Sequence, residues 1–224
     1  MKAIFSLLLL FTTLANADEI GSQFKEKAEA GDARAQYYLA DTWFSSGDDK
    51  QAGLWAEKAA KGGDIDAMAL LSQIHFKHGE YAQAKTLAQQ ATLAGSKRGA
   101  IMLARLLVNT QAGTTDYPQA IKLLQTATDD IDNDSAVDAQ MLLGLIYANG
   151  VEMPQDDAQA ELWLKRSSAL SRTGYAEYWA GMVFQRGEKG FITPNKQKAL
   201  YWFNLSCSEG FDTGCEEFEA LSGE

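Results

Sequence analysis

Histidine and cysteine are scarce in this sequence, which contains only two of each among 224 residues. Histidine is the side chain that most often transfers protons in enzymes, and zinc sites draw their ligands mainly from histidine and cysteine. The H-E-x-x-H and G-x-S-x-G motifs and the phosphate-binding glycine loop are also missing from the sequence. We therefore expect a protein without catalytic residues, without a metal and without a cofactor.

Basic residues and long apolar runs are scarce as well. Asp and Glu number 30 against 20 for Lys and Arg, which gives a formal net charge of −10. Such a surface repels phosphate backbones and anionic lipids, so nucleic acid is not an expected partner. Beyond residue 17, no apolar run approaches the roughly 20 residues of a membrane-spanning helix, and we expect no membrane insertion. With only three prolines, the chain favours helices over strands.

Residues 1–17 have the pattern of a secretory signal peptide. Lys2 provides a positive charge, residues 4–11 form a short apolar run, and Ala15 and Ala17 place small side chains before a cleavage point at Asp18. No cysteine lies near that point, so a lipid anchor is not expected. The mature chain would then be residues 18–224, exported from the cytoplasm. An uncleaved membrane anchor is the alternative interpretation.

One helical pattern recurs five times. A small residue opens each copy, an apolar residue follows four positions later, and the next position is again small. The opening residues are Ala35, Ala67, Gly99, Ala139 and Ala176, and the second small residues are Ala40, Ser72, Ala104, Gly144 and Gly181. A bulky residue follows three positions on, at Trp43, His75, Leu107, Tyr147 and Phe184. These offsets keep to one helical face, and a small residue permits a close helix crossing.

A second helical pattern follows each copy of the first. It has a large apolar residue at Trp55, Leu87, Leu123, Trp163 and Trp202, and a small residue at Ala59, Ala91, Ala127, Ser167 and Ser206. A glycine commonly closes the unit, at Gly63, Gly95, Gly174 and Gly210, where we expect a left-handed cap. The two patterns together predict five helical hairpins, at residues 35–66, 67–98, 99–138, 139–175 and 176–213. Such hairpins bury their apolar faces by stacking on one another. The recurring tryptophans and Trp43 should lie in the core, whereas Trp179 fits no position of the pattern.

The fourth unit resembles the Sel1-like repeat, a relative of the tetratricopeptide repeat. The resemblance is carried by Ala139, Gly144, Tyr147, Gly150, Asp157, Ala160, Trp163 and Lys165, and it extends over about residues 24–221. The third unit departs most, because Leu107 stands where the family prefers tyrosine and no glycine closes its second helix. The resemblance implies an all-α fold, a right-handed α/α superhelix (solenoid) of five hairpins. Residues 24–31 and 214–224 would form its terminal caps.

The two cysteines, Cys207 and Cys215, lie in the last unit and the C-terminal cap. Their spacing resembles that of secreted, cysteine-rich members of the repeat family, whose disulfides join neighbouring helices. Export would place the pair in an oxidising compartment. We therefore interpret it as a structural disulfide on the cap. A redox-active pair is the alternative, although the C-x-x-C arrangement is absent.

Three further motifs each have a simpler explanation. His75 and His78 have a spacing that can bind a metal, but packing explains His75, which occupies the bulky position of its repeat. Residues 130–134 imitate the start of a calcium loop, although glycine and glutamate are missing from the required positions, so an acidic interhelix loop is the simpler interpretation. Ser22 and Lys25 match the S-x-x-K motif of β-lactamases without the partner motifs S-D-N and K-T-G.

The family resemblance further implies that the first helix of each hairpin lines a concave groove. Counted from each opening residue, positions −1, +2, +6, +9 and +10 should face this groove. Our candidate protein-binding residues are Tyr37, Asp41, Gln73, Arg105, Asn109 and Tyr178, and the wider set adds Arg34, Lys77, Arg98, Met141, Asn149, Tyr175, Met182 and Gln185. Aromatic, arginine and amide side chains suit a peptide or protein ligand. Solvated helix faces are the alternative explanation.

The sequence thus predicts a monomeric, non-catalytic scaffold or adaptor in the bacterial periplasm, which binds a protein or peptide in its concave groove. A secreted effector that binds a host protein would use the same groove and is an alternative. A hydrolase of β-lactams or cell-wall amides is the other alternative, because of the motif at Ser22.

Overall fold

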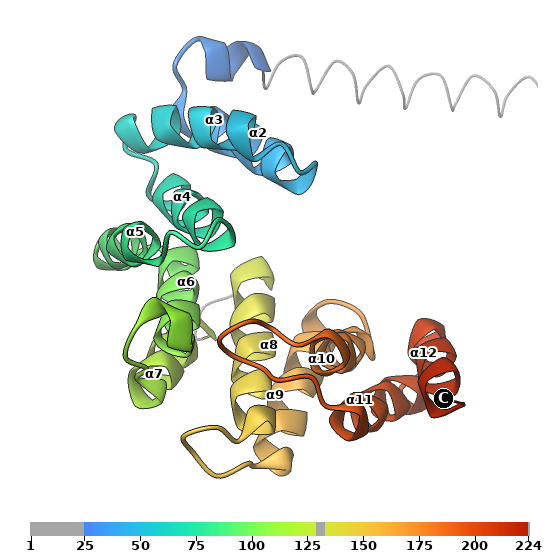
Figure 1. Cartoon of the computed structure of the whole chain (residues 1–224). Helices are drawn as coiled ribbons and strands as arrows, with labels where there is room; N and C mark the ends of the chain where they lie inside the picture. The colour runs from blue at the N-terminus through green and yellow to red at the C-terminus, as the bar shows by residue number, and fades with distance from the viewer. Residues whose placement is uncertain (1–24, 129–132, 224) are drawn as a thin grey trace, which may run out of the picture.

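The computed structural model describes residues 25–128 and 133–223, and Figure 1 shows their helices stacked as consecutive antiparallel pairs in a curved array. The five pairs are α2 (Ala33–Ser45) with α3 (Asp49–Lys61), α4 (Ile65–Lys77) with α5 (Tyr81–Leu93), α6 (Lys97–Leu107) with α7 (Tyr117–Thr128), α8 (Asn133–Asn149) with α9 (Asp157–Leu170), and α10 (Tyr175–Arg186) with α11 (Lys196–Ser208). A helical turn at residues 25–29 precedes them, a short 3₁₀ helix, η1 (Thr110–Ala112), follows α6, and α12 (Asp212–Ser222) ends the array. The predicted solenoid of hairpins with caps at both ends is confirmed.

Local signals explain where the helices begin and end. Most first helices start after an aspartate or serine whose side chain accepts a hydrogen bond from the backbone N–H three residues on, as Asp64 does from Ala67 at 2.9 Å. At the end of α3, Gly63 adopts a φ of 92°, which favours glycine, and Asp64 N–H donates to Ala59 O at 2.9 Å. Gly95 and Gly210 also have positive φ, as predicted. Gly174 does too, but it lies at the start of α10 and not at the end of α9.

Small residues allow the helices to approach closely, both within a hairpin and between hairpins. A Cβ on Gly144 would lie 2.5 Å from the Leu164 side chain, and one on Gly181 would lie 2.5 Å from the Phe203 ring. These contacts join the two helices of one hairpin. A Cβ on Gly99 would lie 2.5 Å from the Cβ of Ala91, which belongs to the preceding hairpin. The small residues that recur in the sequence therefore mark the crossing points of the helices.

The apolar side chains form two clusters. The first includes Tyr37, Leu70 and Ile74 and belongs to the first two hairpins, whereas the second extends from α5 to α12. Trp163 and Trp202 are buried in the second cluster and Trp55 packs on the first, as predicted.

The prediction for Trp43 is wrong, because this residue is 37% exposed. The described chain that precedes α2 contacts this helix near Gln36, whose side-chain amide donates to Ala28 O at 2.9 Å. Gln36 lies about two helical turns from Trp43. The turn at residues 25–29 therefore covers the beginning of α2 and leaves Trp43, near the end of the helix, exposed.

A disulfide joins Cys207 in α11 to Cys215 in α12, as the sequence predicted. It ties the last hairpin to α12, whose Leu221 is buried against the second apolar cluster. Within the described part of the chain, no helix is both long enough and apolar enough to cross a membrane.

Reduction of the disulfide should destabilise the protein. The bond closes a loop with a sequence separation of eight residues, for which loop entropy corresponds to about 2–3 kcal/mol. We expect reduction to lower the free energy of unfolding by that amount in guanidinium titrations with and without dithiothreitol. The double variant Cys207→Ser/Cys215→Ser should match the reduced protein and should not respond to dithiothreitol. Equal stability of the oxidised and reduced wild type would contradict a stabilising role.

Replacement by alanine should destabilise the protein at Gly181 but not at Gly53. Gly181→Ala should lower the free energy of unfolding by about 1–3 kcal/mol, since the new methyl group meets the Phe203 ring. Gly53→Ala is the matched control, because nothing lies within 4 Å of a Cβ at that helical position. There the lower backbone entropy of alanine should raise stability by about 0.5–1 kcal/mol. Thermal unfolding of both variants tests this difference, and an unchanged or higher stability of Gly181→Ala would contradict the role of close packing at Gly181.

Candidate binding groove

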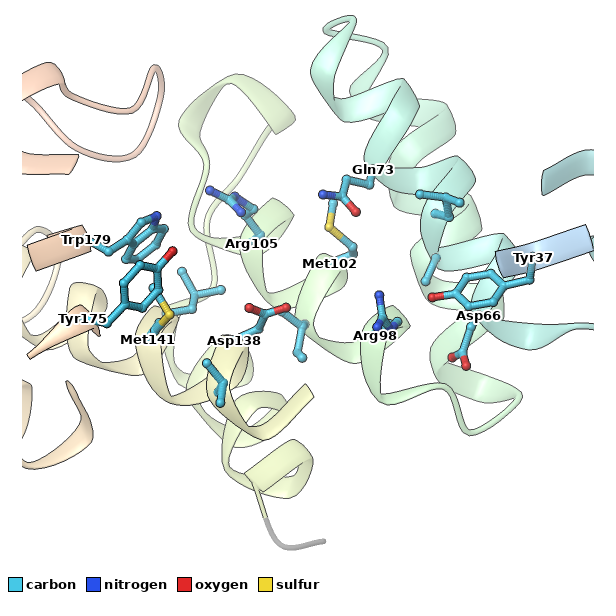
Figure 2. A pocket seen from close by; sticks show the side chains of 15 residues that line it. Tyr37, Asp66, Gln73, Arg98, Met102, Arg105, Asp138, Met141, Tyr175 and Trp179 are labelled. Carbon is cyan, nitrogen blue, oxygen red and sulfur yellow. The ribbon is translucent and has the colours of Figure 1, made fainter. Parts of the chain in front are cut away.

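The first helices of all five hairpins line a single pocket of about 290 Å³ (Figure 2). Its residues are Tyr37 from α2, Asp66, Ala69, Leu70 and Gln73 from α4, Arg98, Ile101, Met102 and Arg105 from α6, Val137, Asp138, Met141 and Leu142 from α8, and Tyr175 and Trp179 from α10. Helices so far apart in the sequence can share one pocket only where the array is concave. The pocket therefore lies in the groove that the family resemblance implied.

The pocket has an apolar floor, two polar edges and aromatic ends. The floor consists of the aliphatic and methionine side chains of α4, α6 and α8. In Figure 2, Asp66, Arg98 and Asp138 lie along one edge, and Gln73 and Arg105 lie along the other. Tyr37 stands at one end, opposite Tyr175 and Trp179. An elongated ligand could contact the floor while its polar groups reach either edge.

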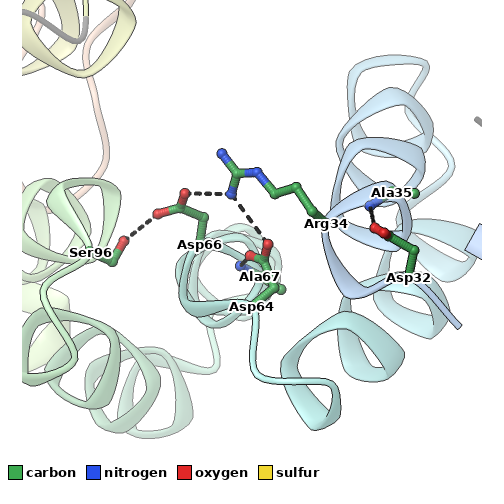
Figure 3. Close-up of polar contacts among 7 residues, drawn as sticks. All are labelled: Asp32, Arg34, Ala35, Asp64, Asp66, Ala67 and Ser96. Carbon is green, nitrogen blue, oxygen red and sulfur yellow. Dashed lines mark hydrogen bonds and ion pairs between the residues drawn. The ribbon is translucent and has the colours of Figure 1, made fainter.

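One polar edge begins with a network of paired charges (Figure 3). The guanidinium of Arg34 donates to Asp66 at 2.8 Å and to Asp64 at 3.2 Å, and the hydroxyl of Ser96 donates to Asp66 at 2.7 Å. Partial burial alone would raise the pKa of Asp66, but the hydrogen bonds from Arg34 and Ser96 hold it below its ordinary value. The network joins α2, α4 and the start of α6, three successive first helices.

Tyr37 places a hydroxyl in the pocket lining that is both buried and without a hydrogen bond from the described residues. Its side chain is 2% exposed, and among the described residues the hydroxyl has no hydrogen-bond partner. Burial raises the pKa of Tyr37 to about 12, so the hydroxyl stays protonated at neutral pH. The guanidinium carbon of Arg98 lies 5.8 Å from the centre of its ring. The carboxylate of half-buried Asp41 is close enough to raise the pKa of both Tyr37 and Arg98.

The opposite edge is supported by residues 187–195, the segment between α10 and α11, which we call the strap. The carboxylate of Glu188 in the strap accepts two hydrogen bonds from Arg105, at 3.0 and 2.8 Å. Paired, parallel hydrogen bonds of this kind fix the orientation of a guanidinium. Arg105 thus lines the pocket with its charge already compensated by a residue 83 positions away.

Asn109 anchors the strap and is almost completely buried, with 1% of its surface exposed. Its side-chain amide donates to Lys189 O at 2.9 Å, and Thr110 N–H donates to Gly190 O at 2.7 Å. A Cβ on Gly190 would lie 2.3 Å from the side-chain oxygen of Asn109, so this position requires glycine. Asn109 therefore holds the edge of the groove, although it does not line the pocket itself.

The six predicted residues occupy different places around the groove. Tyr37, Gln73 and Arg105 line the pocket, Asp41 lies beside it, and Asn109 holds the strap. Tyr178 packs among aromatic rings at the C-terminal end of the array, 5.3 Å from Phe211 and 6.0 Å from Phe203 between ring centres. From the wider set, the pocket includes Arg98, Met141 and Tyr175.

The sequence analysis left several pocket residues unnamed, among them one row, and it missed the strap. This row stands three positions after the opening residue in the last four hairpins and consists of Leu70, Met102, Leu142 and Trp179. Each of these residues lies four positions after the residue that precedes the opening residue, and residues four apart share one face of a helix. Because that preceding residue was expected to face the groove, the same spacing could have identified this row. No comparable signal indicates the strap, because it has no counterpart in the other units.

The remaining motifs do not form a second candidate site. The ring of His75 contacts the carboxylate of Glu80, and Nε2 of His78 lies 3.1 Å from a carboxylate oxygen of Asp49. Among the described residues, no group of three histidine, cysteine or acidic side chains is arranged to hold a metal ion. Residues 130–132 of the calcium-like segment 130–134 lie outside the described residues, and so does Ser22, which precedes residue 25.

Comparison with known proteins assigns the repeat. A family model of the Sel1 repeat matches residues 33–64, 100–130, 137–171 and 174–211. The chain belongs to the Sel1 repeat family. Residues 65–99 lie outside the matched segments, although they form the hairpin of α4 and α5 with the same packing. Proteins of this family typically serve as non-catalytic scaffolds for protein–protein interaction.

Relatives of the whole chain are found in enteric bacteria. The sequence is 63% identical over 227 residues to the Sel1-repeat-containing protein YjcO of Escherichia coli (strain K12), with 99% of each chain covered. A crystal structure of a Sel1 repeat protein from Klebsiella pneumoniae subsp. pneumoniae has 64% sequence identity and a TM-score of 0.87, covering 90% of this chain and 99% of that one. A Sel1 repeat protein from Oxalobacter formigenes, 19% identical with a TM-score of 0.54, shares the fold over 87% of this chain and 80% of its own.

The ion pair between Arg34 and Asp66 should make stability depend on pH in the acid range. Because the pKa of Asp66 is lower in the folded protein, its contribution is present above the unfolded pKa of about 4 and is lost as the pH falls through the folded value. The wild type should therefore lose more unfolding free energy than Asp66→Asn between about pH 5 and pH 2. Urea titrations across this range test the difference, with exposed Glu216→Gln as a control for the loss of one acidic group. Parallel curves for wild type and Asp66→Asn would contradict the role of this pair.

Proposed function

We propose that this protein is an exported scaffold of the bacterial periplasm that binds a protein or peptide segment along its concave groove. The observation that carries this proposal is the pocket itself, which five successive first helices line together. A groove of this kind presents a continuous surface to an elongated ligand and needs no catalytic group. The proposal agrees with the scaffold role that is typical of the family.

The chemistry of the lining supports a polypeptide ligand. Tyr175 and Trp179 provide aromatic surface, and Met102 and Met141 provide flexible apolar surface that adapts to different side chains. The exposed amide of Gln73 can both donate and accept hydrogen bonds, as backbone amides require. Such combinations of aromatic, methionine and polar groups are typical of protein-binding surfaces.

One feature of the sequence and one of the structure support export. Residues 1–17 have the composition of a cleaved leader, and a disulfide between the two cysteines is the oxidised form that persists outside the cytoplasm. We expect the chain isolated from the periplasm to begin at Asp18.

Affinity capture with matched variants tests this function. The mature protein is immobilised and exposed to a periplasmic extract, beside a groove variant, Gln73→Ala/Tyr175→Ala, and a control variant, Gln89→Ala/Tyr201→Ala. All four side chains are exposed, so their removal should leave the fold intact, and the control removes the same residue types from the second helices α5 and α11. We expect a protein that is captured by wild type and control and lost with the groove variant. Calorimetry with the purified partner should show at least a tenfold weaker affinity for the groove variant.

Two outcomes would contradict the proposal. Capture of the same protein by all three baits would place the interaction outside the groove. If no protein were enriched by the wild type, binding to a periplasmic partner would be refuted. Circular dichroism and thermal unfolding of each bait establish that a loss of capture does not result from unfolding.

A further inference from the structure

The charged side chains of the groove are largely compensated by the protein itself. Arg34 and Asp66 form an ion pair at 2.8 Å, and Glu188 holds Arg105 with two hydrogen bonds. Arg98 is half-buried, and although burial opposes its charge, the surrounding Tyr37, Asp41, Asp66 and Asp138 raise its pKa above the ordinary value. A charged ligand would have to compete with these internal partners after losing its own hydration, which is costly. The pocket therefore offers little net charge for a ligand to neutralise.

Among the described residues that line the pocket, Tyr37 has a buried hydroxyl that remains unsatisfied. It is buried, it has no hydrogen-bond partner among the described residues, and Figure 2 shows it directed into the pocket toward Arg98. Because its pKa is raised to about 12, the group is a donor at physiological pH. A buried donor without an acceptor is unfavourable, and an acceptor supplied by a ligand would relieve this cost. To reach the hydroxyl, the ligand oxygen would displace the Arg98 side chain.

The floor of the pocket selects apolar surface of limited size. The apolar side chains of this floor come from three neighbouring helices and are Leu70, Ile101, Met102, Met141 and Leu142. The volume of about 290 Å³ is at the lower limit of the range for small-molecule sites, so the pocket holds one or two side chains and not a whole helix. The thioethers of the two methionines adapt to aliphatic and aromatic shapes alike.

We infer that the groove selects an uncharged, extended peptide segment, which places an apolar side chain on the methionine floor and a backbone carbonyl against the hydroxyl of Tyr37. This inference rests on the proposed function and specifies the chemistry of its ligand. Selection by apolar contact and one neutral hydrogen bond implies that affinity depends weakly on ionic strength. An acidic or basic segment would instead bind through the charged edges and would lose affinity as salt is added.

Methionine-methyl NMR provides a test within the protein as it exists. The mature chain, labelled with ¹³C at its methionine methyl groups, is titrated with three acetylated and amidated hexapeptides, Gly-Ser-X-X-Ser-Gly, in which X is leucine, glutamate or lysine. Met102 and Met141 line the pocket and should report binding, whereas Met68, Met153 and Met182 lie outside it and serve as internal controls. We expect the leucine peptide to shift the two pocket signals with at least tenfold higher affinity than either charged peptide. Its affinity should change less than twofold between 50 and 500 mM NaCl.

Two neighbouring tyrosines of α2 provide a matched pair of variants. Tyr37→Phe keeps the ring and removes only the hydroxyl, and it should weaken binding of the leucine peptide about 3- to 10-fold, the range for one neutral hydrogen bond. Tyr38→Phe should leave the affinity unchanged, since Tyr38 is exposed and does not line the pocket. Unperturbed methyl spectra of the free variants establish that both retain the fold.

The possible failures are distinguishable from failure of the proposed function. Tighter binding of the glutamate or lysine peptide, or a steep dependence on salt, would show that charge selects the ligand and would overturn the inference while groove binding stands. Equal effects of Tyr37→Phe and Tyr38→Phe would refute the role of the hydroxyl. If none of the peptides shifts Met102 or Met141 while a captured protein still requires the groove, apolar selection is wrong and the scaffold function remains. Loss of groove-dependent capture would refute the proposed function itself.

Discussion

The close approach of helices at small residues is the constraint on which this structure depends. At Gly181 the two helices of a hairpin approach until no Cβ fits beside Phe203, and at Gly99 one hairpin approaches the next in the same way. Larger side chains at these positions would separate the helices. Separation would also pull apart the first helices, whose neighbouring side chains form the ion pair of Arg34 with Asp66 and the apolar floor of the pocket. The groove is thus a consequence of the packing that closes and stacks the hairpins.

The strap adds a constraint that stacking alone does not supply. In a solenoid each repeat contacts its neighbours, so curvature accumulates from small rotations between adjacent units. Here the strap leaves the fifth hairpin and reaches the third, where Glu188 binds Arg105 and Gly190 packs against Asn109. Phe191 and Ile192 in the strap are buried in the second apolar cluster. A contact that passes over one whole hairpin limits the change in curvature between the third and fifth units, and so it fixes the width of the groove at that edge.

Sequence periodicity predicted the parts of this structure that depend on neighbouring residues. The hairpins, their glycine caps and half of the candidate residues, such as Gln73, follow from spacing along single helices. The row that includes Met102 and Trp179 was missed because it lies three positions after the opening residue, a position that was not counted among those facing the groove. The strap was beyond such reasoning, since the role of Asn109 depends on a loop 80 residues later. Trp43 was placed in the core because it occupies the same position of the repeat as Phe184. The two residues differ in burial because Trp43 lies in the first hairpin, which in the described chain is preceded only by the turn at residues 25–29 and not by another hairpin.

The net negative charge of the chain acts on molecules at a distance, whereas the paired charges of the groove matter only to a molecule in contact with it. A net charge of −10 acts over about one Debye length, roughly 8 Å at physiological salt, and influences which molecules approach. Arg98 and Arg105 in the pocket, and Arg34 beside it, already face carboxylates of the protein, so the same acidic side chains contribute little to retaining a ligand. For the proposed peptide ligand, retention would depend on apolar area removed from water, at about 25 cal/mol per Å², and on satisfaction of the Tyr37 hydroxyl. Under the proposed function, long-range charge would therefore affect the rate of encounter, while the apolar floor and a single hydrogen bond would determine how long a partner stays bound.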